Sequence, residues 1–121
     1  MKNLKKIAFA ALFACSNAFA GSLVCSGTVE SVGYHDRDKL MVKLSSMNTS
    51  VFFCNPNAEW QAPGTGRVMN PETCKSLFAT FLSARATKEP ISVVHFDGDN
   101  VPSTCSGFEN FKDVFIRFVN Y

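Results

Sequence analysis

The chain has 121 residues, of which 46% are hydrophobic and 18% charged, and its formal net charge is +2. The first 20 residues hold three lysines and no acidic side chain, so the rest of the chain carries nine basic against ten acidic residues. This near-neutral remainder lacks the basic surface that nucleic-acid binding requires. No apolar run in it approaches the ~20 residues of a membrane-spanning helix.

Residues 1–20 have the pattern of a bacterial secretory leader. Three lysines precede an apolar stretch at 7–14, and residues 18–20 (AFA) form a small-x-small cleavage site. We therefore predict that Gly21 begins an exported mature chain, periplasmic or secreted. Residues 12–15 (LFAC) partly match a lipidation signal, but Phe13 occupies a position that usually holds a small residue, which favours ordinary cleavage.

Four cysteines remain after the leader, an even number that is typical of disulfides in a small exported domain. Three pairings exist, and we predict Cys54–Cys74 together with Cys25–Cys105. The first bridge would close the loop between a strand and the first turn of a helix, and the second would tie the first strand to a late loop. No Cys-x-x-Cys motif is present, so these cysteines are interpreted as structural.

Alternating apolar residues predict three strands in the first half of the mature chain. Residues 23–34 form a strand whose apolar phase slips near residues 30–31, which is typical of a bulged, bent strand. After a polar turn at 35–38, the second strand turns Leu40, Val42 and Leu44 inward. The third strand is residues 51–54, followed by a loop at 55–69.

A single helix is predicted from Asn70-Pro71, which supplies a cap and a favourable first-turn proline, to about Thr87. The expected buried stripe of this helix comprises Cys74, Leu77, Phe78, Phe81 and Leu82. Two more strands follow at 91–96 and 114–121, separated by a turn at 97–100 and an irregular segment. The apolar residues expected to face away from the core are Met41, Phe52, Phe115 and Val119.

Three strands, a helix and two strands are the element order of a five-stranded OB barrel, with the helix between strands three and four. We predict this OB-like fold, mainly β with one helix, in a single domain at residues 21–121. The alternative is another small α+β sheet with one packed helix.

The helix region also carries a resemblance. Residues 72–88 (ETCKSLFATFLSARATK), followed by ISVV at 91–94, resemble small secreted bacterial proteins related to the OB-fold B subunits of subtilase-cytotoxin-like and pertussis-like AB-type toxins. The resemblance implies an OB fold, a homo-oligomeric ring (a pentamer), and binding of cell-surface glycans. It carries over no glycan-contact residue.

Six residues are candidates for ligand binding. Trp60 is the sole tryptophan and lies in the polar loop 55–69, where an exposed ring could stack on a sugar; the alternative is that it folds back onto the core. In an OB barrel the loops 35–39 and 97–112 flank the usual binding face. These two loops or their edges supply the remaining candidates, Tyr34, His35, Asp36, Asp97 and Asp99.

Catalytic and metal sites have little support in the sequence. The two histidines, His35 and His95, are too few for a zinc site once the thiols are paired. Residues 97–100 (DGDN) begin like a calcium loop but lack its terminal glutamate, and no Gly-x-Ser-x-Gly motif is present. We therefore expect no enzyme activity and no metal or other cofactor.

These observations lead to one functional hypothesis and one alternative. The hypothesis is an exported, disulfide-stabilised module that binds a glycan or a protein partner, similar to a toxin B subunit. The alternative is a periplasmic inhibitor or accessory protein of a single enzyme.

Overall fold

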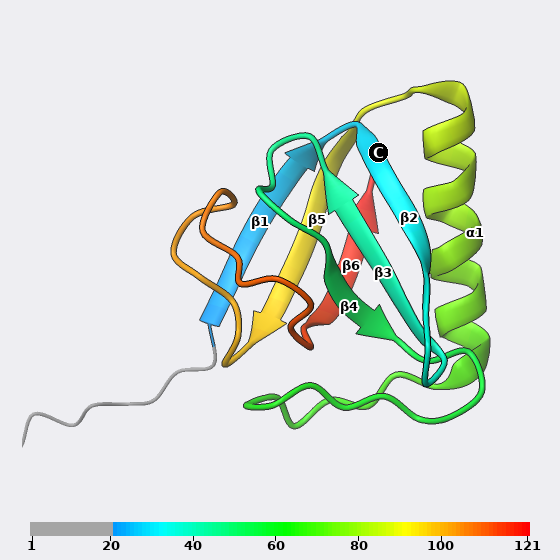
Figure 1. The fold of residues 1–121 in the computed structure, drawn as a ribbon, viewed down its shortest axis with the longest axis vertical. Coiled ribbons are helices and arrows are strands. Elements are labelled where there is room, and N and C mark those ends of the chain that lie inside the picture. The colour runs from blue at the N-terminus through cyan, green and yellow to red at the C-terminus, as the bar shows by residue number, and fades with distance from the viewer. Residues whose placement is uncertain (1–20) are drawn as a thin grey trace, which may run out of the picture.

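The computed structural model describes residues 21–121, so the predicted leader lies outside the described residues. Figure 1 shows a mainly β chain with one long helix at its side. No helix within residues 21–121 is long and apolar enough to cross a bilayer. The elements in chain order are β1 (Gly21–Gly27), β2 (Val29–His35), β3 (Lys39–Leu44), β4 (Val51–Cys54), α1 (Pro71–Thr87), β5 (Ile91–Gly98) and β6 (Phe115–Asn120).

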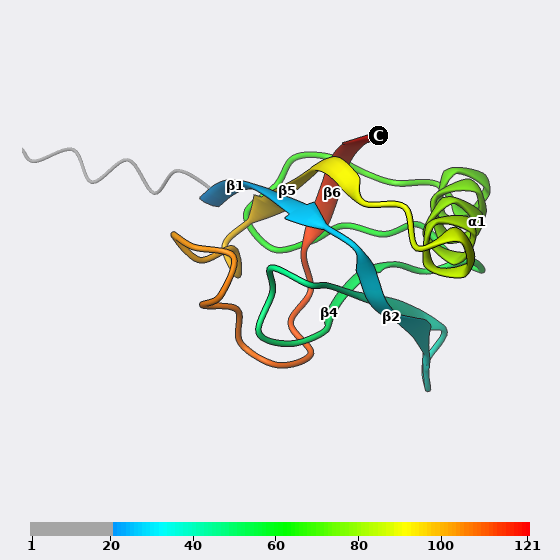
Figure 2. The same ribbon diagram turned by 90° about the horizontal axis from the view of Figure 1, so that it is seen from above.

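The strands form two three-stranded antiparallel sheets, ordered β1-β5-β6 and β2-β3-β4. The prediction of five strands was wrong, because the single strand predicted at 23–34 is divided into β1 and β2. As a result, α1 follows the fourth strand instead of the third. The division lies at Gly27, whose φ of +130° is a conformation that side chains disfavour. A Cβ there would lie 2.2 Å from Ser45 Oγ, so the close approach also requires glycine. The bend turns the chain from one sheet into the other (Figure 2).

The two sheets meet at β4, where a parallel bridge joins Phe52 to Asp113. The Phe52 N–H donates to Lys112 O and the Val114 N–H donates to Phe52 O, both at 2.9 Å. All four residues of β4 are buried. Strands in contact with neighbours on both faces lose the simple alternation of buried and exposed residues.

The alternation predicted for β3 is confirmed, since Leu40, Val42 and Leu44 are buried. The outward orientation predicted for Phe52 and Phe115 was wrong, because both are buried where the sheets meet. Met41 and Val119 are partly buried against the core.

The helix begins and ends as the sequence predicts. Asn70 is its N-cap, and the Asn70 Oδ1 accepts a 2.8 Å hydrogen bond from the Thr73 N–H. The helix ends at Thr87, and the next residue, Lys88, has left-handed backbone angles. Phe81 is buried and packs edge-on against Phe53, with ring centroids 5.2 Å apart.

The buried stripe of α1 is narrower than predicted. Cys74, Phe81 and Ala84 are buried, while Leu77 and Phe78 are partly buried. Leu82 is 45% exposed, so its predicted burial was wrong. Ala84, which the predicted stripe did not include, is part of the buried face of α1.

Both predicted disulfides are present. Cys54–Cys74 joins the end of β4 to the first turn of α1, and Cys25–Cys105 joins β1 to the loop before β6. The Cα atoms are 5.6 Å and 5.9 Å apart, within the usual range. Two disulfides are compatible with a protein outside the cytoplasm.

Asn48 fixes the irregular segment before β6. Its Nδ2 donates to Phe108 O at 2.7 Å, and its Oδ1 accepts from the Phe108 N–H at 2.9 Å. The buried Phe108 ring then packs against Phe96, with centroids 5.3 Å apart.

Replacing Asn48 with alanine should therefore lower the free energy of unfolding by about 1–3 kcal/mol, because both backbone groups of Phe108 lose their partner. Urea denaturation measures the change. Asn48→Asp keeps the acceptor and should cost less than alanine. Equal losses for the two variants would contradict the account of Asn48 as a paired donor and acceptor.

Candidate functional site

The six candidate residues lie in three separate parts of the structure. Trp60 belongs to the core, three candidates lie at the β2–β3 turn, and two lie at the end of β5. The structure therefore does not bring them into one site.

Trp60 is folded back onto the core, which was the alternative to an exposed ring. The residue is 6% exposed, and its indole N–H donates to Val114 O at 2.9 Å. The Lys39 Nζ lies 5.6 Å from the ring centroid. A sugar could stack on this ring only after the loop 55–69 moved, so Trp60 acts as a core residue.

The turn between β2 and β3 carries exposed polar and aromatic side chains. Tyr34 is exposed, and the His35 Nδ1 lies 2.5 Å from Asp36 Oδ1. Arg37 and Asp38 both have positive φ, as in the tight turns that join hairpin strands. We call residues 34–39 the hairpin tip.

The loop before β6 reaches this hairpin tip through Phe111. The rings of His35, Phe52 and Phe111 lie 5.3–5.6 Å apart in all three pairs. The Lys39 Nζ lies over Phe52 and forms an ion pair with Asp113 at 3.1 Å. Phe111 thus brings the loop 97–112 into contact with the hairpin tip. A pocket of about 230 Å³ opens beside these rings.

Asp97 lies in a second pocket, on the outer face of the β1-β5-β6 sheet. We call this the sheet-face pocket; its volume is about 210 Å³, and it is lined by Ser22, Gly64, Thr65, Gly66, Arg67, Asp97 and Arg117. Strand register explains the convergence, because Ser22 pairs with Asp97 across β1 and β5. The loop containing Gly64 and Arg67 supplies the other wall.

The Asp97 carboxylate is the centre of a polar network. Asp97 is 4% exposed, and the Arg117 Nε donates to its Oδ2 at 2.8 Å. The His95 Nε2 lies 3.1 Å from Asp97 Oδ1 and 2.7 Å from Ser22 Oγ. A buried carboxylate with partners on both oxygens is held in one position. The network therefore presents fixed polar groups at the pocket.

This arrangement of serine, histidine and aspartate is not that of a hydrolase triad. In a triad the imidazole contacts the serine and the acid through opposite ring nitrogens. Here Ser22 and Asp97 both approach Nε2 of His95, so the acid cannot orient His95 to accept a proton from Ser22. Within residues 21–121 no cluster of three or more His, Cys, Asp or Glu side chains could hold a metal ion.

Exposed apolar residues lie next to the sheet-face pocket. Val24, His95 and Phe118 are register neighbours across the three strands. Phe118 is 47% exposed, and its ring centroid lies 5.1 Å from that of His95. The outer sheet face thus presents an aromatic ring beside the polar groups of the pocket.

Asp99 follows the end of β5 and contacts the loop that carries Pro63 and Gly64. A Cβ on Gly64, which has φ +81°, would fall 2.0 Å from Asp99 Oδ1. The Asp99 N–H also donates to Pro63 O at 2.8 Å. These contacts hold the loop that forms one wall of the pocket against the end of β5.

Ser22, Arg67 and Arg117 were not among the predicted site residues, and His95 was considered only as a zinc ligand. One local signal was available for His95, since His95 and Asp97 are two residues apart in a strand and so share a face. The others come from distant segments, and only strand pairing brings them to the pocket.

Replacing Asp97 with asparagine should destabilise the protein by about 1–3 kcal/mol, because a buried charge-assisted hydrogen bond to Arg117 is lost. Thermal or urea unfolding measures this effect. Asp99→Asn, two residues away and exposed, should change stability by less than about 0.5 kcal/mol. A neutral Asp97→Asn variant would show that the network does not fix the carboxylate.

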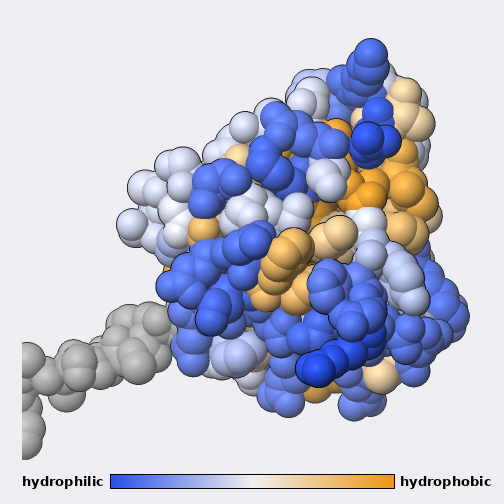
Figure 3. Space-filling view, viewed as in Figure 1, coloured by the Kyte–Doolittle hydropathy of each residue, from blue (hydrophilic) through white to orange (hydrophobic). Residues whose placement is uncertain are grey.

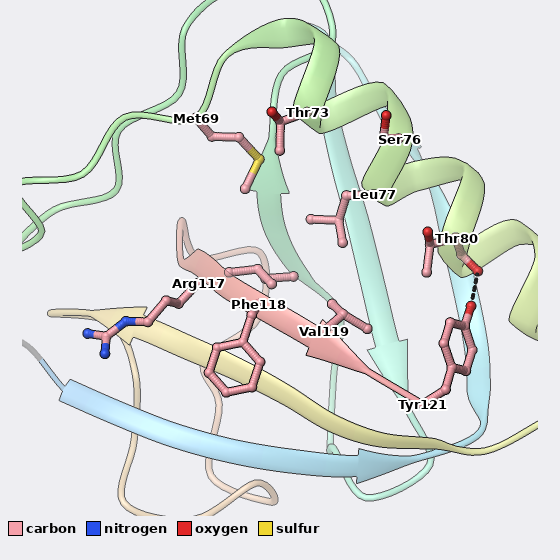
Figure 4. A pocket seen from close by; sticks show the side chains of 10 residues that line it. Met69, Thr73, Ser76, Leu77, Thr80, Arg117, Phe118, Val119 and Tyr121 are labelled. Carbon is pink, nitrogen blue, oxygen red and sulfur yellow. Dashed lines mark hydrogen bonds between the residues drawn. The ribbon is translucent and has the colours of Figure 1, made fainter.

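The largest of these pockets is a groove between α1 and β6, shown in Figure 4. Its volume is about 320 Å³, and Leu77, Ile116 and Val119 contribute apolar surface to it. At one end the Tyr121 hydroxyl donates to Thr80 O at 3.1 Å.

Comparison of the chain with protein-family models, with curated proteins and with solved structures finds no match in any of the three.

Proposed function

We propose that this protein is an exported binding module that recognises a glycan at the sheet-face pocket. The observation that carries the proposal is the combination of a fixed polar network, centred on Asp97, with the exposed ring of Phe118. Sugars present hydroxyl groups at their edges and C–H groups on their faces. A site that recognises them therefore needs hydrogen-bonding groups beside an aromatic surface.

The charges of the pocket suit a polar ligand that is rich in oxygen atoms. Asp97 pairs with Arg117, and the exposed Arg67 adds a second cationic donor to the lining. Arg117 donates only through Nε to Asp97, and its side chain is 43% exposed. The rest of its guanidinium is therefore available to donate to ligand oxygens.

An OB-like barrel is the proposed interpretation of the two sheets. The parallel bridge between Phe52 and Asp113 supports it, because it closes β4 onto the segment leading into β6. The antiparallel pairing of β1 with β5 also supports the barrel, because it joins the first strand to a strand that follows the helix. The resemblance at residues 72–88 agrees with this interpretation and with a glycan ligand.

A glycan array probed with the purified mature protein tests the function. We expect binding to a restricted set of glycans, and we expect Arg67→Ala to raise the Kd of the strongest one at least tenfold. Arg37→Ala, an exposed arginine at the hairpin tip, is the matched control and should leave the Kd unchanged. Absence of glycan binding, or equal losses in the two variants, would contradict the proposal.

Ring formation, the assembly implied by the resemblance, is part of the same proposal. Apolar side chains reach the surface over the upper part of α1 and β2 (Figure 3). On α1, Leu82 is 45% exposed. A closed ring would cover such surfaces. Analytical ultracentrifugation at tens of micromolar should give a single closed oligomer, a pentamer. A monomer would reject the ring and leave the glycan proposal standing.

A second candidate function, inhibition of one enzyme, is favoured by the hairpin tip. Figure 2 shows this turn projecting from the body of the protein. The positive φ angles of Arg37 and Asp38 and the ring contacts of His35 give it a defined shape. Binding to a single periplasmic enzyme that is lost in Arg37→Ala, without glycan binding, would select this function.

A further inference from the structure

The groove between α1 and β6 has the form of a slot for an extended chain. One wall is β6 and the other is the face of α1 that carries Thr73, Ser76 and Thr80 (Figure 4). Leu77 and Val119 point into the space between them. Tyr121 lies at one end of the slot and Met69 near the other.

The wall formed by β6 is an unused strand edge. Within residues 21–121, β6 pairs with β5 alone, and the bridge to β4 ends before β6 begins. Alternate N–H and C=O groups of Phe115–Asn120 are therefore free to bond a further strand. Such an edge readily accepts another chain unless it is covered.

The other features of the groove define the chemistry of that chain. Its apolar lining accommodates side chains at alternate positions of a strand, because those positions point to one side. The hydroxyls of α1 suit small polar residues at the rim. Arg117 is the only charged residue that lines the groove, and its side chain is 43% exposed. Arg117 pairs with Asp97 through Nε, so its other guanidinium N–H groups can still bind one carboxylate of a segment that is otherwise uncharged.

We propose that an extended peptide segment docks in this groove by adding a strand to β6. The segment carries apolar side chains at alternate positions and one Asp or Glu that pairs with Arg117. Backbone hydrogen bonds supply affinity in such strand addition, and the side-chain pockets supply selectivity. This surface is separate from the hairpin tip, but it shares Arg117 and Phe118 with the proposed glycan site.

The test uses a synthetic library of octapeptides with Val, Ile or Phe at alternate positions, Ser or Thr between them, and one Glu. Fluorescence polarisation should identify members that bind the mature protein with micromolar Kd. Replacing Glu by Gln in the best member should raise its Kd several-fold. Amide hydrogen exchange of Phe115–Asn120 should slow when this peptide is bound.

Backbone N-methylation distinguishes strand addition from side-chain binding alone. Methylation of residues whose N–H faces β6 should raise the Kd at least tenfold, whereas methylation of the intervening residues should have little effect. In the protein, Ser76→Trp should fill the groove and abolish binding. Ser83→Trp, also exposed on α1 but outside the groove, is the matched control.

Three results would overturn the proposal: no library member binds, both sets of N-methylated peptides bind equally, or Ser83→Trp weakens binding as much as Ser76→Trp. A fourth result would replace the peptide by a second copy of this chain. In that case the free protein would be an oligomer whose β6 amides are already protected, and Ser76→Trp would dissociate it.

Discussion

Replacing Phe81 with alanine should lower the free energy of unfolding by about 3–5 kcal/mol, the usual cost of emptying a fully buried aromatic site. Phe81 is the buried centre of the contact between α1 and the β2-β3-β4 sheet, where its ring meets Phe53. Neither β4 nor α1 can move in to fill the cavity left by the Phe81 ring, because the Cys54–Cys74 bridge joins the two elements nearby. Urea denaturation followed by circular dichroism measures the loss.

Leu82→Ala is the matched control for Phe81→Ala. It removes a large apolar side chain from the next position of the same helix, but Leu82 is largely exposed. The expected loss is below about 1 kcal/mol. If both variants lost the same free energy of unfolding, α1 would not pack on the sheet through the face that carries Phe81.

Removing the Cys25–Cys105 bridge should have the second large effect. Its cysteines are 80 residues apart, and loop-closure entropy then predicts a loss of about 4.5 kcal/mol. The Cys54–Cys74 bridge spans 20 residues, for which the same relation gives about 3 kcal/mol. The double alanine variants, compared with the oxidised protein by urea denaturation, measure the two losses.

The difference between the two losses in free energy of unfolding tests the loop-closure explanation more sharply than either loss alone. The order of the losses follows from loop length, so Cys25→Ala with Cys105→Ala should be the less stable pair of substitutions. A larger loss from Cys54→Ala with Cys74→Ala would show that packing around the buried bridge, rather than loop closure, dominates. Reduction of the wild-type protein should destabilise it at least as much as either pair alone.

The helix could be predicted because its start is marked by neighbouring residues, and the disulfides because few pairings are possible. Asn70 and Pro71 mark the start of α1 within two residues, and four cysteines allow only three pairings. The division of the first strand could not be predicted. A slip of the apolar phase indicates a bend, but the contact between Gly27 and Ser45 that separates β1 from β2 depends on the folded chain.

The site was harder to predict than the fold for the same reason. Trp60 stands in a polar loop, and its hydrogen-bond partner, Val114, is 54 residues away. The outward orientation assigned to Phe52 followed from strand alternation, which fails where β4 is buried on both faces. Asp97 was a candidate because a turn was predicted at residues 97–100, but it lies within β5, and its partner Arg117 belongs to another strand.

The most direct test of the proposed function is a ¹⁵N–¹H NMR titration of residues 21–121 with the glycan that binds most strongly in the array. We expect the largest chemical-shift changes at and beside the sheet-face pocket, at the amides of Ser22, Arg67, Asp97 and Phe118. The amides of Arg37 and Asp38 at the hairpin tip should be unchanged. Shift changes centred on the hairpin tip, or none at all at saturating glycan, would contradict it.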